Sequence, residues 1–375
     1  MPSPERLKEA ERLMVICNAC RYCSGYCAVF PAMERRRTFT KQDLVYLSNL
    51  CFECRACLYA CQYAPPHEFG VNVPKAFAEL RVDTYSDYSW PRILSGLFRH
   101  SGLTAGLTTA LCVTLVLLLT FTFQGSSVLF GTHLGSGAFY AVVPFAAMVL
   151  PATAMMLYGL LALLVGFVNF LRDTGGRLRE VISPAAFFRA VKDAFGLVYM
   201  KGGGAGCNYP DEEFSHKRRW YHHLVFYGFL LDLAATTVAA IYHHFFDWVA
   251  PYPIWSAPVV LGTVGGVMLL IGTAGLLFLK ARSDREASDP QMLQLDVAFL
   301  VLLFLTSLTG LLLLGFRETT AMGTLLAVHL GVVAGLFLTL PYSKFAHAVY
   351  RYAALVQNAI EERQEAGQDT AGGSS

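Results

Sequence analysis

Eight of the ten cysteines occur as two copies of one spacing. Each copy reads Cys-x2-Cys-x2-Cys-x3-Cys, and the two sets are Cys17, Cys20, Cys23 and Cys27, then Cys51, Cys54, Cys57 and Cys61. This pattern is typical of chains that hold two 4Fe–4S clusters, where the fourth cysteine of each copy ligates the other cluster. We therefore predict one cluster on Cys17, Cys20, Cys23 and Cys61, and a second on Cys51, Cys54, Cys57 and Cys27. Such a pair of clusters carries electrons.

Disulfide bonds and zinc are the two alternative uses of these cysteines. A disulfide framework needs an oxidising compartment, and no signal peptide with a cleavage site precedes the first set. Zinc binds paired Cys-x2-Cys motifs, but four cysteines in this order, twice, exceed what tetrahedral zinc sites use. The fourth cysteines are followed by Ala28 and Gln62, where bacterial ferredoxins have proline, so the local turn differs.

The segment between the two sets, residues 28–50, predicts a helical ferredoxin-like domain and not the β-hairpin kind. It mixes charged residues with apolar ones at helical spacing, and these are Phe39, Leu44, Leu47 and Leu50. Thr40, with Asp43 three residues later, is a helix-start signal. The basic run at 35–37 most often marks a solvated face, and its alternative is a docking surface for an acidic electron donor.

The rest of the chain has the composition of a membrane protein. The chain is 55% hydrophobic and 15% charged, and the apolar runs gather after residue 103. Six runs reach the roughly 20 residues that cross a bilayer: 103–123, 139–170, 221–244, 257–279, 292–316 and 321–342. We expect a mainly α fold, divided as a ferredoxin-like domain at 1–90, a linker at 91–102, a six-span haem-binding domain at 103–357 and a disordered tail at 358–375.

The distribution of Lys and Arg predicts the orientation of the spans. The connections 124–138, 245–256 and 317–320 contain one such residue, Arg317, whereas the opposite side, including the loop 171–220, is rich in them. Because basic residues stay on the cytoplasmic side, we predict a multi-pass protein of the cytoplasmic (inner) membrane with both termini in the cytoplasm. The clusters then lie in the reducing compartment.

Histidines at two depths of the third and sixth spans predict haem. The 18 residues from His329 to His347 are a whole number of helical turns, which puts both side chains on one face, about 27 Å apart. We predict bis-histidine ligation of b-type haem, once or twice. The predicted ligands are His222, His223 and His347 for a cytoplasmic haem, and His243, His244 and His329 for an outer one. The alternatives are snorkelling of the outer pair into the headgroups and packing of His329 in the core.

Several other features have structural explanations. Gly262, Gly265 and Gly272 in the fourth span predict close helix packing. The glycine-rich stretch 201–206 is interpreted as a flexible linker after an amphipathic segment, 184–200, at the membrane surface. Cys207 lacks an evident partner, and Cys112 is a small apolar residue of a span. No Rossmann glycine motif opens a βα unit, so NAD or FAD has no visible site.

The combination of these motifs resembles the tricarballylate-utilisation protein B (citrate-utilisation protein B) family. The resemblance rests on the two cysteine sets together with RRWYHHLVFYGF at 218–229, HLG at 329–331 and LPYSKFAH at 340–347. The membrane half is also similar to the haem-binding gamma subunit of nitrate reductases, whose last helix carries two haem histidines. The resemblance implies that a soluble FAD-dependent dehydrogenase that oxidises tricarballylate is the electron donor, and that the chain passes electrons from its reduced FAD to membrane quinone.

We expect no catalytic side chain, because the cofactors perform the redox steps, and no nucleic acid among the partners. One alternative is a membrane anchor of a larger reductase complex that oxidises quinol. Another is a redox-sensing transporter, suggested by the six spans. Transport should need polar or interrupted helices at the midplane, and the fourth and sixth spans offer only small residues and His329.

Overall fold

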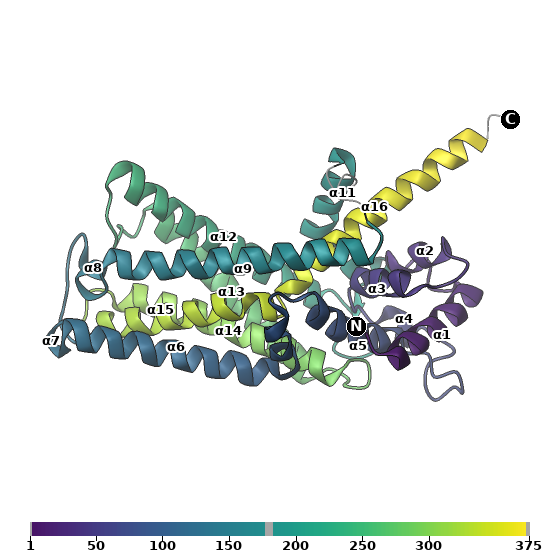
Figure 1. Cartoon of the computed structure of the whole chain (residues 1–375), viewed down its shortest axis with the longest axis horizontal. Helices are drawn as coiled ribbons and strands as arrows, with labels where there is room; N and C mark the ends of the chain where they lie inside the picture. The colour runs from purple at the N-terminus through teal and green to yellow at the C-terminus, as the bar shows by residue number, and fades with distance from the viewer. Residues whose placement is uncertain (1, 177–182, 373–375) are drawn as a thin grey trace.

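The computed structural model describes residues 2–176 and 183–372, and within them the fold is helical, as predicted. The only strands in these ranges are β1 (Cys207–Asn208) and β2 (Phe214–Ser215), an antiparallel pair with Cys207 opposite Ser215. Figure 1 shows an elongated molecule with long helices at one end and the short N-terminal helices at the other.

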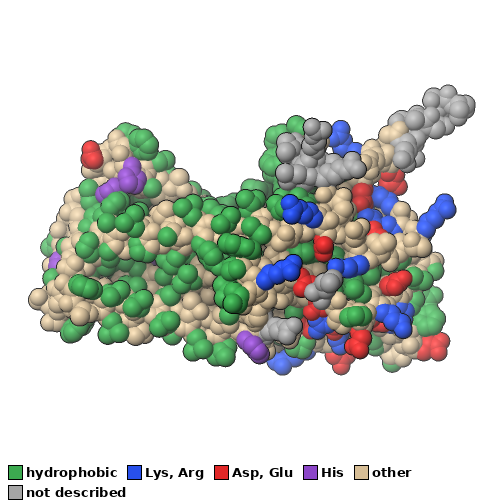
Figure 2. All heavy atoms as spheres, viewed as in Figure 1, with side chains coloured by type: hydrophobic (Ala, Val, Ile, Leu, Met, Phe, Trp, Pro, Cys, Tyr) green, Lys and Arg blue, Asp and Glu red, His purple; other side chains and the backbone are tan. Residues whose placement is uncertain are grey.

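Six helices are long and apolar enough to cross a membrane, which confirms the predicted spans. They are α6 (Ser101–Gln124), α9 (Phe145–Asp173), α12 (Lys217–Phe246), α13 (Ala257–Ala281), α14 (Pro290–Phe316) and α15 (Met322–Thr339) with η4 (Leu340–Tyr342). The short helices α7 (Ser126–Leu129) and α8 (Ala138–Val142) lie at the far end of the bundle. On the face shown in Figure 2, hydrophobic side chains are spread over the bundle, and most charged side chains gather at the end that carries the N-terminal domain.

Glycines let these helices approach closely, as predicted for the fourth span. A Cβ atom at Gly228 of α12 would lie 2.9 Å from the carbonyl oxygen of Gly265 on α13. A Cβ atom at Gly331 of α15 would lie 2.4 Å from Cα of Val113 on α6. Because any larger side chain would collide with backbone, these crossings depend on glycine.

The N-terminal domain is built from short helices, in agreement with the predicted helical ferredoxin-like domain. They are α1 (Pro4–Cys20), α2 (Val29–Glu34), α3 (Lys41–Leu50), α4 (Ala56–Tyr59) and α5 (Val73–Tyr88). The predicted helix start is confirmed, because Thr40 and Asp43 form a complete capping box on α3. The predicted linker contains the 3₁₀ helix η1 (Arg92–His100).

An aromatic cluster joins this domain to the bundle. The rings of Tyr88 on α5, Phe170 on α9 and Tyr350 on α16 (Ala346–Gly372) meet pairwise at centroid distances of 5.7 to 5.8 Å. The hydroxyl of Tyr88 donates to Asp173 at 2.9 Å. These buried contacts fix the N-terminal domain against the ends of two long helices.

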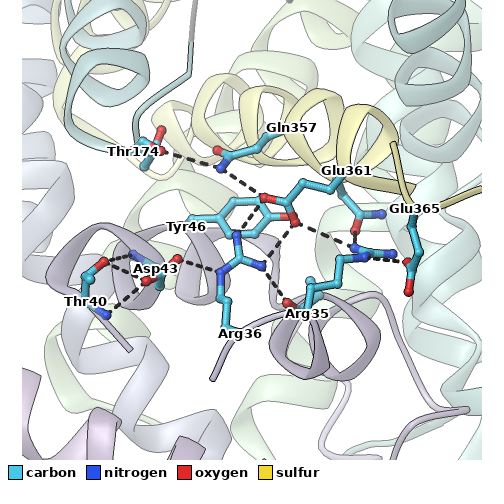
Figure 3. A network of polar contacts seen from close by, with 11 residues as sticks. Arg35, Arg36, Thr40, Asp43, Tyr46, Thr174, Gln357, Glu361 and Glu365 are labelled. Atoms are coloured by element: carbon cyan, nitrogen blue, oxygen red, sulfur yellow. Dashed lines mark hydrogen bonds and ion pairs between the residues drawn. The ribbon is translucent and has the colours of Figure 1, made fainter. Parts of the chain in front are cut away.

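The structure corrects the predicted disordered tail and the predicted solvated basic run. Helix α16 continues to Gly372, and residues 373–375 lie outside the described residues. The Arg36 guanidinium binds both oxygens of Glu361, at 2.6 and 3.1 Å, and Arg35 binds Glu365 at 2.9 Å (Figure 3). These ion pairs join the tail to the N-terminal domain and explain its helical order. They link residues more than 300 positions apart, so the sequence of either segment gives no sign of them.

The last span does not carry its two histidines on one continuous helix. Helix α15 ends at Thr339, η4 follows, and Ser343 is extended, with φ −112° and ψ −179°. Pro341 lies within this break, where proline cannot donate the hydrogen bond that would continue the helix. The single continuous helix on which the predicted common face of His329 and His347 depends is therefore broken between them.

Candidate functional site

The first predicted cluster set surrounds one cavity. A cavity of about 270 Å³ is lined by Cys17, Cys20, Cys23 and Cys61, and also by Cys57. Helix α1 ends at Cys20 in a left-handed Arg21, and this turns the chain back towards Cys23. Burial raises the pKa of Cys17 and of Cys23 to about 12, so these thiols ionise at neutral pH only against a strong electropositive ligand.

The second predicted set surrounds an adjoining and tighter cavity. Cys27, Cys51, Cys54 and Cys57 line a space of about 10 Å³, and Cys57 borders both cavities. Glu53 and Arg55 have positive φ angles, of 54° and 64°, so the Cys51–Cys57 loop folds tightly around this space. Cys61 thus lies with the first set and Cys27 with the second, the grouping expected for crossed ligation, while ligation itself stays a prediction.

The donor sets fit clusters better than single metal ions. Within 2–176 and 183–372, no three Cys, His, Asp or Glu side chains converge as they would around one ion. A single zinc ion needs thiolates at about 2.3 Å from one point. A 4Fe–4S cluster holds its four thiolates farther apart, because the irons and sulfides lie between them. The first cavity, of about 270 Å³, has room for such a core, whereas the second, of about 10 Å³, would have to widen to take one.

Two arginines, one from the membrane span α12 and one from the last helix, α16, hold the second loop. Arg218 of α12 donates to the carbonyl oxygens of Phe52 at 3.1 Å and Glu53 at 2.7 Å. Arg351 of α16 donates to the carbonyl oxygen of Cys51 at 2.6 Å. The second set is therefore fixed to the bundle through its own backbone.

A buried carboxylate adds a further anchor to this loop. Arg81 of α5 binds Glu53 at 3.0 Å, and Ser288 donates to the same carboxylate at 3.0 Å. Burial alone would raise the pKa of Glu53, but the charges of Arg81 and Lys344 lower it to about 2. Glu53 is thus ionised at neutral pH and joins the N-terminal domain to the bundle.

The glycine-rich stretch is packed against the cysteine loops, so its interpretation as a flexible linker is wrong. The backbone amide of Gly203 donates to the carbonyl oxygen of Tyr26 at 3.1 Å, and the backbone amide of Asn208 donates to the carbonyl oxygen of Cys54 at 3.0 Å. Gly203 has φ 76°, and a Cβ atom there would lie 3.1 Å from the Tyr26 ring. Glycine is needed because the backbone of this loop closes directly over the loops that carry the cysteines.

Cys207, predicted to lack a partner, is fully buried within this covering loop. Its thiol donates to the carbonyl oxygen of Met200 at 3.4 Å. A hydrogen bond with Cys54 is the largest of the influences that lower the pKa of Cys207. The sequence held no spacing signal for this contact, because the two cysteines are far apart along the chain.

On the membrane side of the second set, two histidines face each other. The ring centroids of His222 on α12 and His347 on α16 are 6.3 Å apart, with the planes at 78°. If one metal were held between the two rings, two metal–nitrogen bonds of about 2 Å, with ~1 Å from each nitrogen to its ring centre, would separate the centroids by roughly 6 Å. The pair therefore has the separation that bis-histidine ligation of one iron requires.

The ring nitrogens of this pair are also suited to a metal. Nδ1 of His347 bonds the carbonyl oxygen of Lys344 at 2.5 Å, which leaves Nε2 free. Nδ1 of His222 is buried and has no partner among the described residues. Burial lowers the pKa of His347 well below its usual value, which keeps the ring in the neutral, ligating form. His223 points elsewhere and contacts Trp220 and Tyr227.

The structure does not bring the predicted outer histidines together. His243 stacks on Phe145 at 3.9 Å and contacts His244 at 5.2 Å. His329 shares a hydrogen bond of 3.0 Å with Thr309 of α14. In the described part of the chain, no ring contact joins His329 to either of the other two.

One group at this end of the bundle was missed by the sequence analysis. Asp296 of α14 pairs with Lys280 of α13 and, at 2.7 Å, with Lys344. All three side chains are at most 15% exposed. The signal was present, since a carboxylate within an apolar run marks a functional or structural site in a membrane protein.

Comparisons with known proteins identify the family of this chain. Residues 10–87 match the family model of the citrate utilization protein B Fer4-like domain, and residues 100–368 match that of citrate utilization protein B. Citrate utilization protein B of Escherichia coli is 48% identical over 362 residues, which are 95% of this chain and 93% of the relative. The chain belongs to the citrate utilization protein B family.

Membership of the citrate utilization protein B family confirms the resemblance seen in the sequence. The Fer4-like match covers α1 to α5, the part of the chain that carries both cysteine sets. An iron–sulfur protein with an electron-transfer role fits that domain. No solved structure matches the chain, and the similarity to the gamma subunit of nitrate reductases stays a prediction.

Proposed function

We propose that this protein takes electrons from a reduced flavoprotein and passes them through two 4Fe–4S clusters and b-type haem to membrane quinone. One observation carries the proposal: Arg218 and Arg351 fix the second cysteine set to the two helices whose His222 and His347 rings stand 6.3 Å apart. The cofactors supply the electron-transfer chemistry. The chain supplies their ligands and their order.

The exposure of the two sets supports a direction through the protein. Cys20 of the first set is exposed, whereas Cys51 and Cys54 of the second set are buried. A donor protein can approach the first set from solvent, and the second set adjoins the bundle. The order is then donor flavin, first cluster, second cluster, and the haem held by His222 and His347.

The two-haem form of the proposal adds an outer haem on His329 with His243 or His244, and it requires these histidines to approach each other, since His329 instead bonds Thr309 and His243 stacks on Phe145. Quinone would then exchange electrons within the bilayer. The orphaned ring nitrogen of His243, which is buried without a partner in the described residues, supports a ligand on that side.

The donor in this proposal is a soluble FAD-dependent dehydrogenase, and tricarballylate is the substrate implied by the family resemblance. The name of the Escherichia coli relative points to citrate utilization, a closely similar tricarboxylate chemistry. The proposal also includes the cytoplasmic membrane and cytoplasmic termini, supported by the distribution of Lys and Arg.

Iron, sulfide and haem quantitation on purified protein tests the proposal. We expect about eight non-haem irons per chain and a b-type spectrum that the reduced donor generates and quinone bleaches. Cys54→Ala should lose the second cluster, and His222→Ala and His347→Ala should lose the cytoplasmic haem. His223→Ala is the matched control on the same helix. Cluster-free wild-type protein, or equal haem in all three histidine variants, would contradict the proposal.

A further inference from the structure

The region between the second cysteine set and the histidine pair holds an excess of positive charge. Buried or half-buried side chains of the described residues there comprise the cations Arg55, Arg81, Arg218, Lys280, Lys344 and Arg351, and the carboxylates Glu53, Asp284, Asp289 and Asp296, which are six cations and four carboxylates. Burying unmatched charge is costly. The excess is therefore expected to face an anion, and a cluster bound by four thiolates is one, because the thiolates outweigh the charge of its core.

Arg218 and Arg351 occupy equivalent positions in this region. Arg218 comes four residues before His222 on α12, and Arg351 comes four residues after His347 on α16. Residues four apart share one face of a helix. Each arginine therefore lies one turn from a histidine of the pair, and each binds carbonyl oxygens of the Cys51–Glu53 segment.

We propose that Arg218 and Arg351 are positioning residues that hold the second cluster beside the histidine pair and raise its reduction potential. This inference rests on the proposed function. The step concerned is a one-electron exchange: the reduced cluster is oxidised and the haem iron is reduced, with no bond broken and no proton moved. Reduction adds negative charge to the cluster, so adjacent cations stabilise the reduced form.

The second loop is suited to a strong effect of these charges. Phe52 and Tyr209 stack on the guanidinium groups, Arg351 lying 4.3 Å from the Phe52 ring centre and Arg218 lying 4.9 Å from that of Tyr209. Phe52 and Tyr209 are 4% and 2% exposed. Exclusion of water from this region strengthens electrostatic interactions.

Redox titration followed by electron paramagnetic resonance tests the inference on the full chain in detergent. Arg218→Gln and Arg351→Gln keep a hydrogen-bond donor but remove the charge. In each variant, the equilibrium between the reduced and the oxidised second cluster should shift at least about tenfold towards the oxidised form. This corresponds to a fall of about 59 mV in the reduction potential for one electron. Arg218→Lys and Arg351→Lys keep the charge and should retain the wild-type potential.

Arg282→Gln is the matched control. Arg282 is exposed just after α13, at the same end of the bundle, and lies over the Phe278 ring. Its substitution removes the same charge and should leave the potential unchanged. Reduction of the second cluster by the first should become at least about tenfold less favourable in the two Gln variants and not in the control, by the same free-energy argument.

The possible outcomes decide between the inference and the function on which it rests. Gln variants with full iron content and the potential of Arg282→Gln would overturn the inference and leave the proposed function intact. If a Gln variant loses the cluster, the corresponding Lys variant tests the inference instead. A lowered potential of the second cluster in Lys protein with full iron content would also overturn the inference. Wild-type protein without the clusters or the haem would overturn the proposed function instead.

Discussion

Glu361→Gln should loosen the contact between the last helix and the N-terminal domain. The Glu361 carboxylate accepts hydrogen bonds from two nitrogens of Arg36 and, at 3.3 Å, from the side-chain amide of Gln357. A guanidinium nitrogen of Arg35 lies 3.7 Å from the same carboxylate (Figure 3). The Gln side chain keeps the shape but leaves Arg36 with Asp43 as its only carboxylate partner in the described residues. We expect local opening of α3 and of the start of α16 to become easier.

The burial of the pair sets the magnitude. The Arg36 and Glu361 side chains are 13% and 19% exposed. Exposed ion pairs contribute about 0–1 kcal/mol, whereas breaking a buried pair costs about 3–5 kcal/mol. For this half-buried pair we expect about 2 kcal/mol, which corresponds to a roughly 30-fold loss of amide-exchange protection.

Hydrogen exchange read by mass spectrometry on residues 41–50 and 352–362 would measure this loss. Glu365→Gln is the matched control: it removes the same charge from the same helix, but Glu365 is 57% exposed. We expect Glu365→Gln to lower the free energy of local opening by less than about 1 kcal/mol. Equal loss of protection in the two variants would refute the reasoning, because burial would then not decide the effect.

Three further predictions concern the covering loop, the capping box and the topology. Gly203→Val should lower iron retention, because the added side chain meets Tyr26, whereas Gly204→Val, also at positive φ but in open space, should retain more iron. Asp43→Asn should lower the thermal midpoint at pH 7 by losing about 1 kcal/mol. Burial alone would raise the pKa of Asp43, but the hydrogen bonds from Thr40 and Arg36 lower it. The stabilisation by the Asp43 carboxylate is therefore present above about pH 4. The difference in thermal midpoint between wild type and variant should vanish as the pH falls below that. A reporter fused after Ser375 should read as cytoplasmic and one within 245–256 as external; both on one side would contradict six spans.

Features encoded locally were predictable from the sequence. The two cysteine sets have a fixed spacing, and the six spans are continuous apolar runs, so each could be located without knowing what surrounds it. The capping box of Thr40 and Asp43 is equally local. These features depend on residues within one element, and the structure retains all of them.

Features that join distant segments were not predictable. Arg36 appeared solvated because Glu361 follows 325 residues later. The run at 201–206 appeared flexible because the loops it covers lie far earlier in the chain. The face shared by His329 and His347 was computed for an unbroken helix, and the break around Pro341 removed that register. The structure brings His347 to His222, as the matched depths of the two histidines predicted, but the choice of His222 over its neighbour His223 could not be made from the sequence.

The contacts around the second cysteine set imply an order of assembly during synthesis. Its cysteines leave the ribosome early, but its backbone is held by Arg218 and by Arg351, and it is covered by the loop that ends in Asn208. Arg351 follows the last span. In a newly made N-terminal domain, this set is therefore open until α12 and α16 have folded against it. If the proposed second cluster is bound there, its loading would precede, or compete with, completion of the bundle.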